Sequence, residues 1–285
     1  MVLMAKTAPA PVEGVYPIDT GSCELVRDRF TDGWLLSING AHSSHIDPDD
    51  PLALDFEYMR YMAALLADRT RSDATLRVLH LGGAGCALPR YLAQAYPAAR
   101  QVAVEVDAEL ARLVRDWFDL PRAPRLRIRV GDGREVTESL TAMSRDVVIR
   151  DAFSGEPPRA PAHLTTVEFT ESVRRVLAGG GLYLANCGDS RDLALARAEV
   201  RTISAIFPHV ALVADAGMLK GRRTGNIVIA ASDTPIEASS QLVRTLLADP
   251  LPAQVVAGRR AVEFGRGEIR YDREVGFPND EHQVN

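Results

Sequence analysis

Acidic residues follow three apolar segments of the chain, and a glycine-rich turn follows the apolar segment before them. The turn is Gly82-Gly83-Ala84-Gly85, and the acids are Glu105, Asp132 and Asp151. Glycines in such a turn let the backbone approach a ligand closely at the N-terminus of a helix. Glu105 lies twenty residues after Gly85, the offset at which an acid takes a ribose diol in dinucleotide-type folds. This spacing predicts a nucleoside site.

The two later acids extend the predicted site. Asp132 stands in Gly131-Asp132-Gly133 before a helical segment, and a carboxylate there can accept a hydrogen bond from an adenine amino group. Asp151 opens the loop Asp151-Ala152-Phe153-Ser154-Gly155 and is expected to point into the crevice in front of the nucleoside. Each acid alone also fits a structural role at a strand end, turn or loop, so the hypothesis depends on their combination.

Strand-like and helical segments alternate from Asp73 for more than a hundred residues. The runs VLHL, VAVEV and VVI are nearly continuous in apolar residues, which is typical of strands buried on both faces. The alternation indicates an α/β fold with a doubly wound, mostly parallel sheet. Ligands bind beyond the carboxyl ends of such strands, where all four motifs lie. The runs HVALVADA and IVIAAS, joined without a helix, predict an antiparallel hairpin at one sheet edge.

A small antiparallel β unit is expected ahead of this sheet. Asp32-Gly33 and Asn39-Gly40 separate short apolar runs and are hairpin turn signals. An amphipathic helix that carries Tyr58 on its core-facing stripe follows over residues 51–68. The expected organisation is a mobile leader over 1–13, a β-hairpin domain over 14–50, a Rossmann-like domain over 51–240, and a C-terminal helix and tail over 241–285.

Composition argues against several classes of protein. The chain has 285 residues, of which 46% are hydrophobic and 25% charged, with a net charge of −5, as in a soluble globular protein. The acidity argues against nucleic-acid binding, and no apolar run reaches the roughly 18 residues of a membrane span. The three separated cysteines argue against a disulfide framework and favour a cytoplasmic location. His42 and His45 lack partners at ligand spacing, so no metal is predicted.

Taken together, the motifs resemble the adenosylmethionine-type site of a class I methyltransferase-like domain. Over most of its length the chain is similar to one branch of that fold, the spermidine synthase family of aminopropyltransferases. The similarity is carried by Ile38-Asn39-Gly40, Tyr58-Met59-Arg60-Tyr61-Met62, Val78 to Arg90, Glu105-Val106-Asp107, Val130 to Gly133, the Asp151 loop and the stretch from His163 to Phe169. The resemblance implies a small N-terminal β domain, a seven-stranded sheet and a homodimer or homotetramer.

The resemblance also implies roles for these residues. Glu105 would hold the ribose, Asp132 the adenine, and Asp151 would act as the base on the attacking amine. The implied nucleoside-binding set is Gly82, Gly83, Gly85, Glu105, Asp107, Asp132 and Gly133, and substrate contacts are expected at Tyr58, Ser154 and His163. The implied donor is S-adenosylmethionine or its decarboxylated form, and the implied partner is a small-molecule amine or another nucleophile.

The chain departs from that family where charge would select substrates. In the family's GGGDGG loop an acid holds the free amine of the decarboxylated donor, and here that position is Gly85. Loss of the acid removes selection against the carboxylate of the intact donor. Ser154 replaces a second acid, and the family's hairpin glutamine maps near Ser43. Positive charge is gained before the last hairpin strand, at Lys220, Arg222 and Arg223. These changes argue against a dicationic acceptor.

Several functions stay open at this point. The leading hypothesis is a transferase that alkylates an amine or similar nucleophile by displacement at a carbon next to sulfonium. The alternatives are an adenosylmethionine-dependent methyltransferase proper and a non-catalytic nucleoside-binding relative. A nicotinamide-dependent oxidoreductase would share the glycine loop and Glu105, but does not require Gly131-Asp132-Gly133 or the terminal hairpin. His80 and Cys86 are interpreted as buried core residues.

Overall fold

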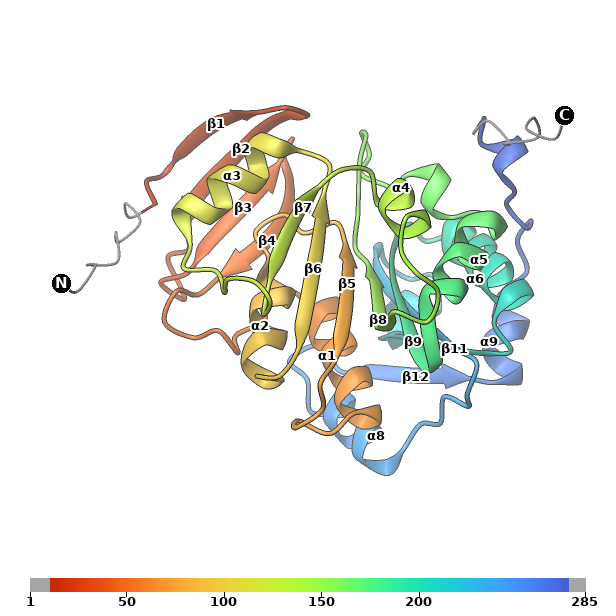
Figure 1. The fold of residues 1–285 in the computed structure, drawn as a ribbon. Coiled ribbons are helices and arrows are strands. Elements are labelled where there is room, and N and C mark those ends of the chain that lie inside the picture. Colours follow the sequence, from red (N-terminus) through yellow and green to blue (C-terminus); the bar gives the residue numbers. More distant parts are fainter. Residues whose placement is uncertain (1–10, 277–285) are drawn as a thin grey trace, which may run out of the picture.

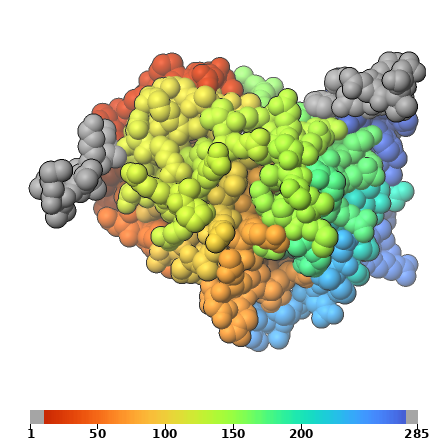
Figure 2. Space-filling model, viewed as in Figure 1, coloured from red at the N-terminus to blue at the C-terminus, as the bar shows by residue number. Residues whose placement is uncertain are grey.

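A computed structural model describes residues 11–276 of the chain. Residues 1–10 of the expected leader and residues 277–285 of the expected tail lie outside the described residues. Within them, a small N-terminal β-sheet packs beside a large sheet covered with helices (Figure 1). The two parts form one continuous body in the space-filling view (Figure 2).

The N-terminal sheet has four antiparallel strands in sequential order. They are β1 (Gly14–Ile18), β2 (Gly21–Arg27), β3 (Trp34–Ile38) and β4 (Ala41–Ile46). Asn39 and Gly40 connect β3 to β4 with φ angles of 49° and 81°, the left-handed values that a two-residue hairpin turn requires. The hairpin predicted at this turn is therefore present.

The large sheet has eight strands in the order β12-β10-β11-β9-β8-β5-β6-β7. Their bounds are β5 (Arg77–Leu81), β6 (Arg100–Glu105), β7 (Arg127–Val130), β8 (Arg145–Arg150), β9 (Leu177–Asp189), β10 (His209–Asp215), β11 (Gly225–Ser232) and β12 (Ala253–Ala257). Strands β5 to β9 pair in parallel, whereas β10, β11 and β12 join antiparallel. The predicted mostly parallel α/β fold with an antiparallel edge hairpin is confirmed.

The expected number of seven strands is corrected to eight. The additional strand is β12, which pairs with β10 at the sheet edge. The strand has the sequence AQVVA, in which only Ala253 is buried and the last three residues are half-buried. Five residues are too few for the apolar pattern alone to distinguish a strand from part of a helix or tail. The described part of the expected C-terminal tail therefore contributes to the main sheet.

Helices cover both faces of the large sheet (Figure 1). Their bounds are α1 (Glu57–Arg69), α2 (Ala87–Ala95), α3 (Ala108–Trp117), α4 (Gly133–Glu138), α5 (Val167–Val176), α6 (Ala194–Ile206), α7 (Ala216–Leu219), α8 (Ser240–Leu247), α9 (Arg259–Phe264) and the 3-10 turns η1 (Ala162–Leu164) and η2 (Asp272–Glu274). Helices α1, α2, α3 and α8 share one apolar cluster, and α4, α5, α6, α7 and α9 share the other. Successive β5 residues alternate between the clusters: Val78 belongs to the first and Leu79 to the second, as the pleat requires.

The topology places a binding crevice where β5 has β6 on one side and β8 on the other. The strand order reverses there, so the loops after β5 and β8 diverge at their carboxyl ends and leave room for a ligand. Among residues 11–276, no helix has both the length and the apolar character needed to span a membrane.

Candidate functional site

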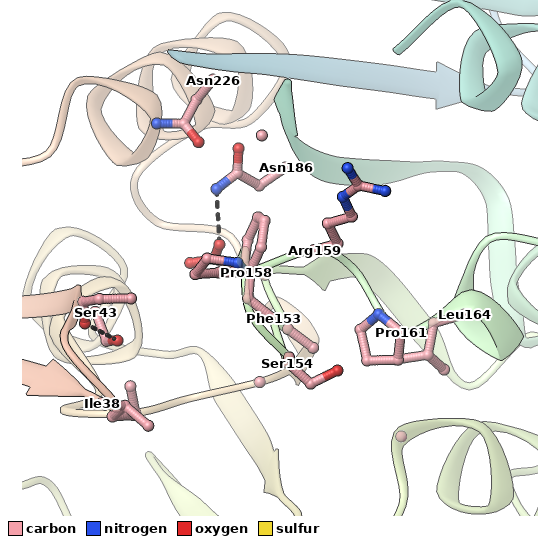
Figure 3. Close-up of a pocket in the computed structure, with 18 of the residues that line it drawn as sticks. Ile38, Ser43, Phe153, Ser154, Pro158, Arg159, Pro161, Leu164, Asn186 and Asn226 are labelled. Atoms are coloured by element: carbon pink, nitrogen blue, oxygen red, sulfur yellow. Dashed lines mark hydrogen bonds between the residues drawn. The ribbon is translucent and has the colours of Figure 1, made fainter. Parts of the chain in front are cut away.

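A cavity of about 1060 Å³ opens at the carboxyl ends of the parallel strands. Ile38 and Ser43 of the N-terminal sheet lie on one side of it, and Arg159, Pro161 and Leu164 lie on the other (Figure 3). The predicted residues that line it are Tyr58, Gly82, Gly83, Glu105, Asp132, Gly133, Asp151, Ser154 and His163. The structure therefore brings the motifs after β5, β6, β7 and β8 to a single cavity.

The turn after β5 needs glycine at its first position. Gly82 has a φ of +85°, and a Cβ on it would lie 2.3 Å from the carbonyl oxygen of Asp151. No side chain fits there, because the backbone of the turn runs against the backbone that leaves β8. The N–H groups of Gly83 and Ala84 then donate to Oε2 of Glu105 at 3.3 and 3.0 Å.

Glu105 is the last residue of β6, and its carboxylate lies against the turn after β5. Besides the two N–H groups on Oε2, its Oε1 accepts a hydrogen bond from the Asp107 N–H at 3.2 Å. Burial raises the pKa of Glu105, although these backbone hydrogen bonds oppose the shift. A carboxylate oriented in this way at the wall of the cavity is suited to accept hydrogen bonds from the hydroxyl groups of a sugar.

Asp132 is held by three donors at the start of α4. Its Oδ1 accepts from the N–H groups of Arg134 and Glu135 at 2.8 and 3.1 Å, and Oδ2 lies 2.8 Å from Nε2 of His163. Burial opposes ionisation, but the Glu135 N–H and the His163 ring hold the pKa of Asp132 below its usual value. A carboxylate offers about four lone-pair sites, so one site on Oδ2 is left for a ligand.

Asp151 is held by two neutral donors. The Tyr58 hydroxyl donates to Oδ2 at 3.0 Å, and Nδ2 of Asn186 donates to Oδ1 at 2.9 Å, the contact drawn as a dashed line from Asn186 in Figure 3. Burial raises the pKa of Asp151, against these hydrogen bonds and the charge of Arg150. Each oxygen keeps a lone pair, so the carboxyl group can accept a proton or hydrogen bonds from a nucleophile in the cavity.

A crystal structure of a probable spermidine synthase from Corynebacterium glutamicum matches this chain over nearly its whole length. The two share 46% identity with a TM-score of 0.87, covering 97% of this chain and 100% of that one. The chain belongs to the spermidine synthase-like family. Its class I methyltransferase fold is also seen in human methyltransferase-like protein 13 in complex with SAH, at 20% identity and a TM-score of 0.55, covering 80% of this chain and 96% of that one.

Curated members of the family match over a shorter stretch. The polyamine aminopropyltransferase of Vibrio vulnificus is 30% identical over 142 residues, which is 49% of this chain and 46% of that protein. The chain thus spans about half the length of the curated aminopropyltransferases that it matches. No family model matches the chain.

Two residues expected in the nucleoside site of a spermidine synthase-like protein lie elsewhere. Asp107 caps α3, where it accepts from the Leu110 N–H at 2.7 Å and from both donors of Thr20, and it does not line the cavity. Gly85 turns toward the N-terminal sheet: its N–H donates to Oγ of Ser44 at 3.0 Å, and a Cβ on it would lie 2.8 Å from Cβ of Ser44. Sequence spacing alone could not distinguish these structural positions from ligand contacts.

The basic residues expected near the acceptor also lie elsewhere. Lys220, Arg222 and Arg223 do not line the cavity, and Arg223 Nε donates to Asp215 at 2.9 Å. Among the lysines and arginines that the structure describes, Arg159 is the one that lines the cavity. Its side chain is drawn beside Asn186 in Figure 3. Acids that line the cavity in addition to Glu105, Asp132 and Asp151 are Glu156, Asp189 and Asp192. The expected loss of negative charge at position 154 is therefore offset by Glu156 in the same loop, by Asp189 at the end of β9 and by Asp192 after it.

Sequence reasoning missed Asn186 and Arg159. Asn186 interrupts the apolar run of β9 and is 1% exposed. Its Oδ1 has no hydrogen-bond partner within the described structure. A polar residue within a buried strand was the available signal, because buried carboxamides need partners. Arg159 carried no such signal, since it is one exposed arginine in a polar loop.

The remaining candidates have structural roles. His80 is buried and its Nε2 lies 2.9 Å from Oε1 of Gln101; burial lowers the pKa of His80 to about 4. Burial raises the pKa of the Cys86 thiol to about 12, so it is not an activated nucleophile. Over residues 11–276, no three His, Cys, Asp or Glu side chains are grouped in a way that could hold a metal ion.

Proposed function

We propose that this chain is a transferase that binds an adenosylmethionine-type nucleoside and moves an alkyl group, aminopropyl or methyl, to an amine. The observation that carries the proposal is Asp151, held by Tyr58 and Asn186, in one cavity with Glu105 and Asp132. Its membership in the spermidine synthase-like family supports the same reaction class.

The residues of the cavity fit the donor. Val106 lines it with a side chain that is 61% exposed and offers an apolar surface to a purine. Glu105 and Asp132 offer acceptors for ribose hydroxyl and adenine amino groups. The lining has six acids and one arginine, a balance that favours a cationic ligand. When bound, the donor would supply an electrophilic carbon next to its sulfonium.

Asp151 would receive the acceptor amine at the other end of the cavity. Its remaining lone pairs can accept N–H groups from the amine and then a proton, while Tyr58 and Asn186 keep the carboxyl group in one orientation. The unpartnered Oδ1 of Asn186 offers a further acceptor beside it. Holding the nucleophile at a fixed distance from the donor carbon supplies much of the rate in such displacements.

The turn after β5 bears on which donor is used. Its N–H groups are already engaged: Gly82 with Val104, Gly83 and Ala84 with Glu105, and Gly85 with Ser44. It presents no acid for the amine of a decarboxylated donor. We therefore propose that the turn does not select the decarboxylated form, which makes methyl transfer from the intact donor the second candidate function.

Calorimetric titration of the protein with S-adenosylmethionine, its decarboxylated form and methylthioadenosine tests the proposal. We expect binding of at least one of them, and absence of binding to all three would overturn it. Binding of NAD instead would favour the oxidoreductase alternative. The Asp151→Asn variant should retain nucleoside binding and lose transfer to amines; unchanged turnover would show that Asp151 is not the base.

A further inference from the structure

The segment after α9 is fixed across the helices on one face of the large sheet. This segment, residues 265–276, is called here the C-terminal strap, and it runs in blue beside α5 and α6 in Figure 1. A Cβ on Gly267 would lie 2.5 Å from Cα of Ala198 in α6. The Arg270 N–H donates to Thr202 at 3.1 Å, and the Val167 N–H donates to the Arg270 carbonyl at 2.9 Å. Nothing in the proposed transfer reaction uses these contacts directly.

Asp272 of the strap forms a buried ion pair with Arg134. The two guanidinium ends donate to its two carboxylate oxygens at 2.6 and 2.5 Å, and the side chains are 8% and 4% exposed. The fork-to-fork geometry fixes the orientation of both groups. Removal of one partner from such a pair leaves a buried charge without compensation, so the pair holds α4 firmly to the strap.

Arg134 connects this pair to the nucleoside end of the cavity. Its backbone N–H donates to Oδ1 of Asp132, and its Nη1 lies 3.4 Å from the carbonyl oxygen of His163. One residue therefore contacts the strap, the carboxylate at the start of α4, and η1. The His163 ring in turn contacts Oδ2 of Asp132.

We propose that Arg134 and Asp272 are positioning residues for adenine recognition. They fix Asp132 and His163 so that the remaining lone-pair site on Oδ2 of Asp132 points to the exocyclic amino group of adenine. The inference rests on the proposed nucleoside binding and adds the C-terminal strap to the parts of the chain that determine base selectivity. The class of ligand selected is a 6-amino purine nucleoside over a 6-oxo one.

The test is a paired titration of each protein with S-adenosylhomocysteine and S-inosylhomocysteine, which differ in the amino group that Asp132 would bind. Wild type is expected to prefer the adenine ligand by about tenfold or more, the effect of a hydrogen bond to a charged group. Asp272→Asn should reduce this preference by several-fold. Both ligands are titrated on the same sample, so a general loss of folded protein does not change the ratio.

Asp249→Asn is the matched control. Asp249 forms an equivalent two-bond pair with Arg60, at 2.7 and 2.9 Å, and does not line the cavity. We expect it to leave the preference unchanged. If Asp272→Asn does not fold, Arg134→Lys, which keeps the charge and loses the fork, takes its place in the same titrations.

The outcomes separate this inference from the function it rests on. Wild type that binds neither ligand overturns both. Equal binding of both ligands by wild type would show that Asp132 does not recognise the amino group. That result would overturn this inference and leave the proposed transferase standing. An unchanged preference in the folded Asp272 or Arg134 variant also overturns the inference and leaves the proposed transferase standing.

Discussion

The hydroxyl of Tyr58 donates a hydrogen bond to Asp151 from a helix that precedes it by 93 residues. That helix, α1, is itself tied to the chain before β12, because the Tyr61 hydroxyl donates to the Leu251 carbonyl at 2.7 Å and Arg60 pairs with Asp249. The orientation of the candidate base thus depends on contacts between the beginning and the end of the main domain.

Tyr58→Phe should move the acid limb of the pH–rate profile to higher pH. Burial already raises the pKa of Asp151, and the Tyr58 hydrogen bond is one of the effects that oppose the rise. Without that bond the ionised form is less stable, so activity should be lost at a higher pH as the pH falls. We also expect a decrease in kcat of about tenfold. Tyr16→Phe removes a hydroxyl that donates to the Val12 carbonyl outside the cavity, and should not shift the profile; equal profiles for both variants would contradict the prediction.

Asp151→Asn should not destabilise the protein at neutral pH. A carboxyl group whose pKa is raised in the folded state binds its proton more tightly there than in the unfolded chain. The stability it contributes is present below the unfolded value of about 3.9 and is lost as the pH rises through the folded value. The neutral amide avoids that loss. We expect the Tm of the variant to equal or exceed wild type at pH 8, with the difference shrinking toward pH 4. A larger Tm deficit at pH 8 than at pH 4 would argue against the raised pKa.

Glu105→Ala and Asp107→Ala should separate binding from stability. Glu105 lines the cavity, so its removal should weaken nucleoside binding about tenfold or more in calorimetry. Asp107 caps α3, and loss of a cap costs about 1 kcal/mol of folding free energy. Denaturant unfolding should detect that cost, with nucleoside affinity unchanged. Weaker nucleoside binding by the folded Asp107→Ala variant would show that Asp107 contributes to the nucleoside site.

Gly85→Asp should lower the Tm without creating selectivity for the decarboxylated donor. A Cβ at this position would lie 2.8 Å from Cβ of Ser44 and 2.9 Å from Cδ1 of Ile46, and Gly85 does not line the cavity. The new carboxylate would therefore be crowded against the N-terminal sheet and would not reach the cavity. Thermal unfolding measures the loss of stability, and paired titrations with the intact and decarboxylated donors measure the ratio of their affinities. A gain of preference for the decarboxylated donor would show that position 85 contacts the ligand.

Arg159→Ser should improve diamines as acceptors relative to monoamines. Arg159 is an exposed cation at the cavity, and its charge opposes a second ammonium group there. The kcat/KM ratio for the two acceptors should rise several-fold at low salt and less at high salt, because salt screens exposed charges. Arg222→Ser provides a matched loss of charge outside the cavity. If both variants give the same ratio, net charge and not position is responsible.

The sequence was sufficient to predict most of the large sheet. The parallel strands are buried on both faces, so VLHL, VAVEV and VVI stand out as apolar runs, and the helices between them determine the pairing. Strand β12 was missed because its side chains are mostly half-buried. Its place in the sheet comes from pairing with β10, which no local pattern reveals.

The candidate site was only partly predictable for a similar reason. Glu105, Asp132 and Asp151 were found because they directly follow strands whose carboxyl ends meet. Asn186 and Arg159 enter the cavity through tertiary structure. The basic residues at positions 220, 222 and 223 were placed near the acceptor from the resemblance to the spermidine synthase family, whereas the structure pairs Arg223 with the carboxylate of Asp215. Asp107 has the charge and spacing of a ligand contact, but the free N–H groups of α3 compete for it.

The close contact between Gly82 and the Asp151 carbonyl links the two ends of the cavity mechanically. A shift of the turn after β5 toward β8 would push the backbone of Asp151, the candidate base. A shift of that backbone would in turn displace Gly82. The proposed donor and acceptor positions are thus held relative to each other through main-chain atoms, independent of the side chains around them. Engineering a larger acceptor space should therefore act on the loop of residues 154–159, which lies outside the contact of Gly82 with Asp151 and Ala152.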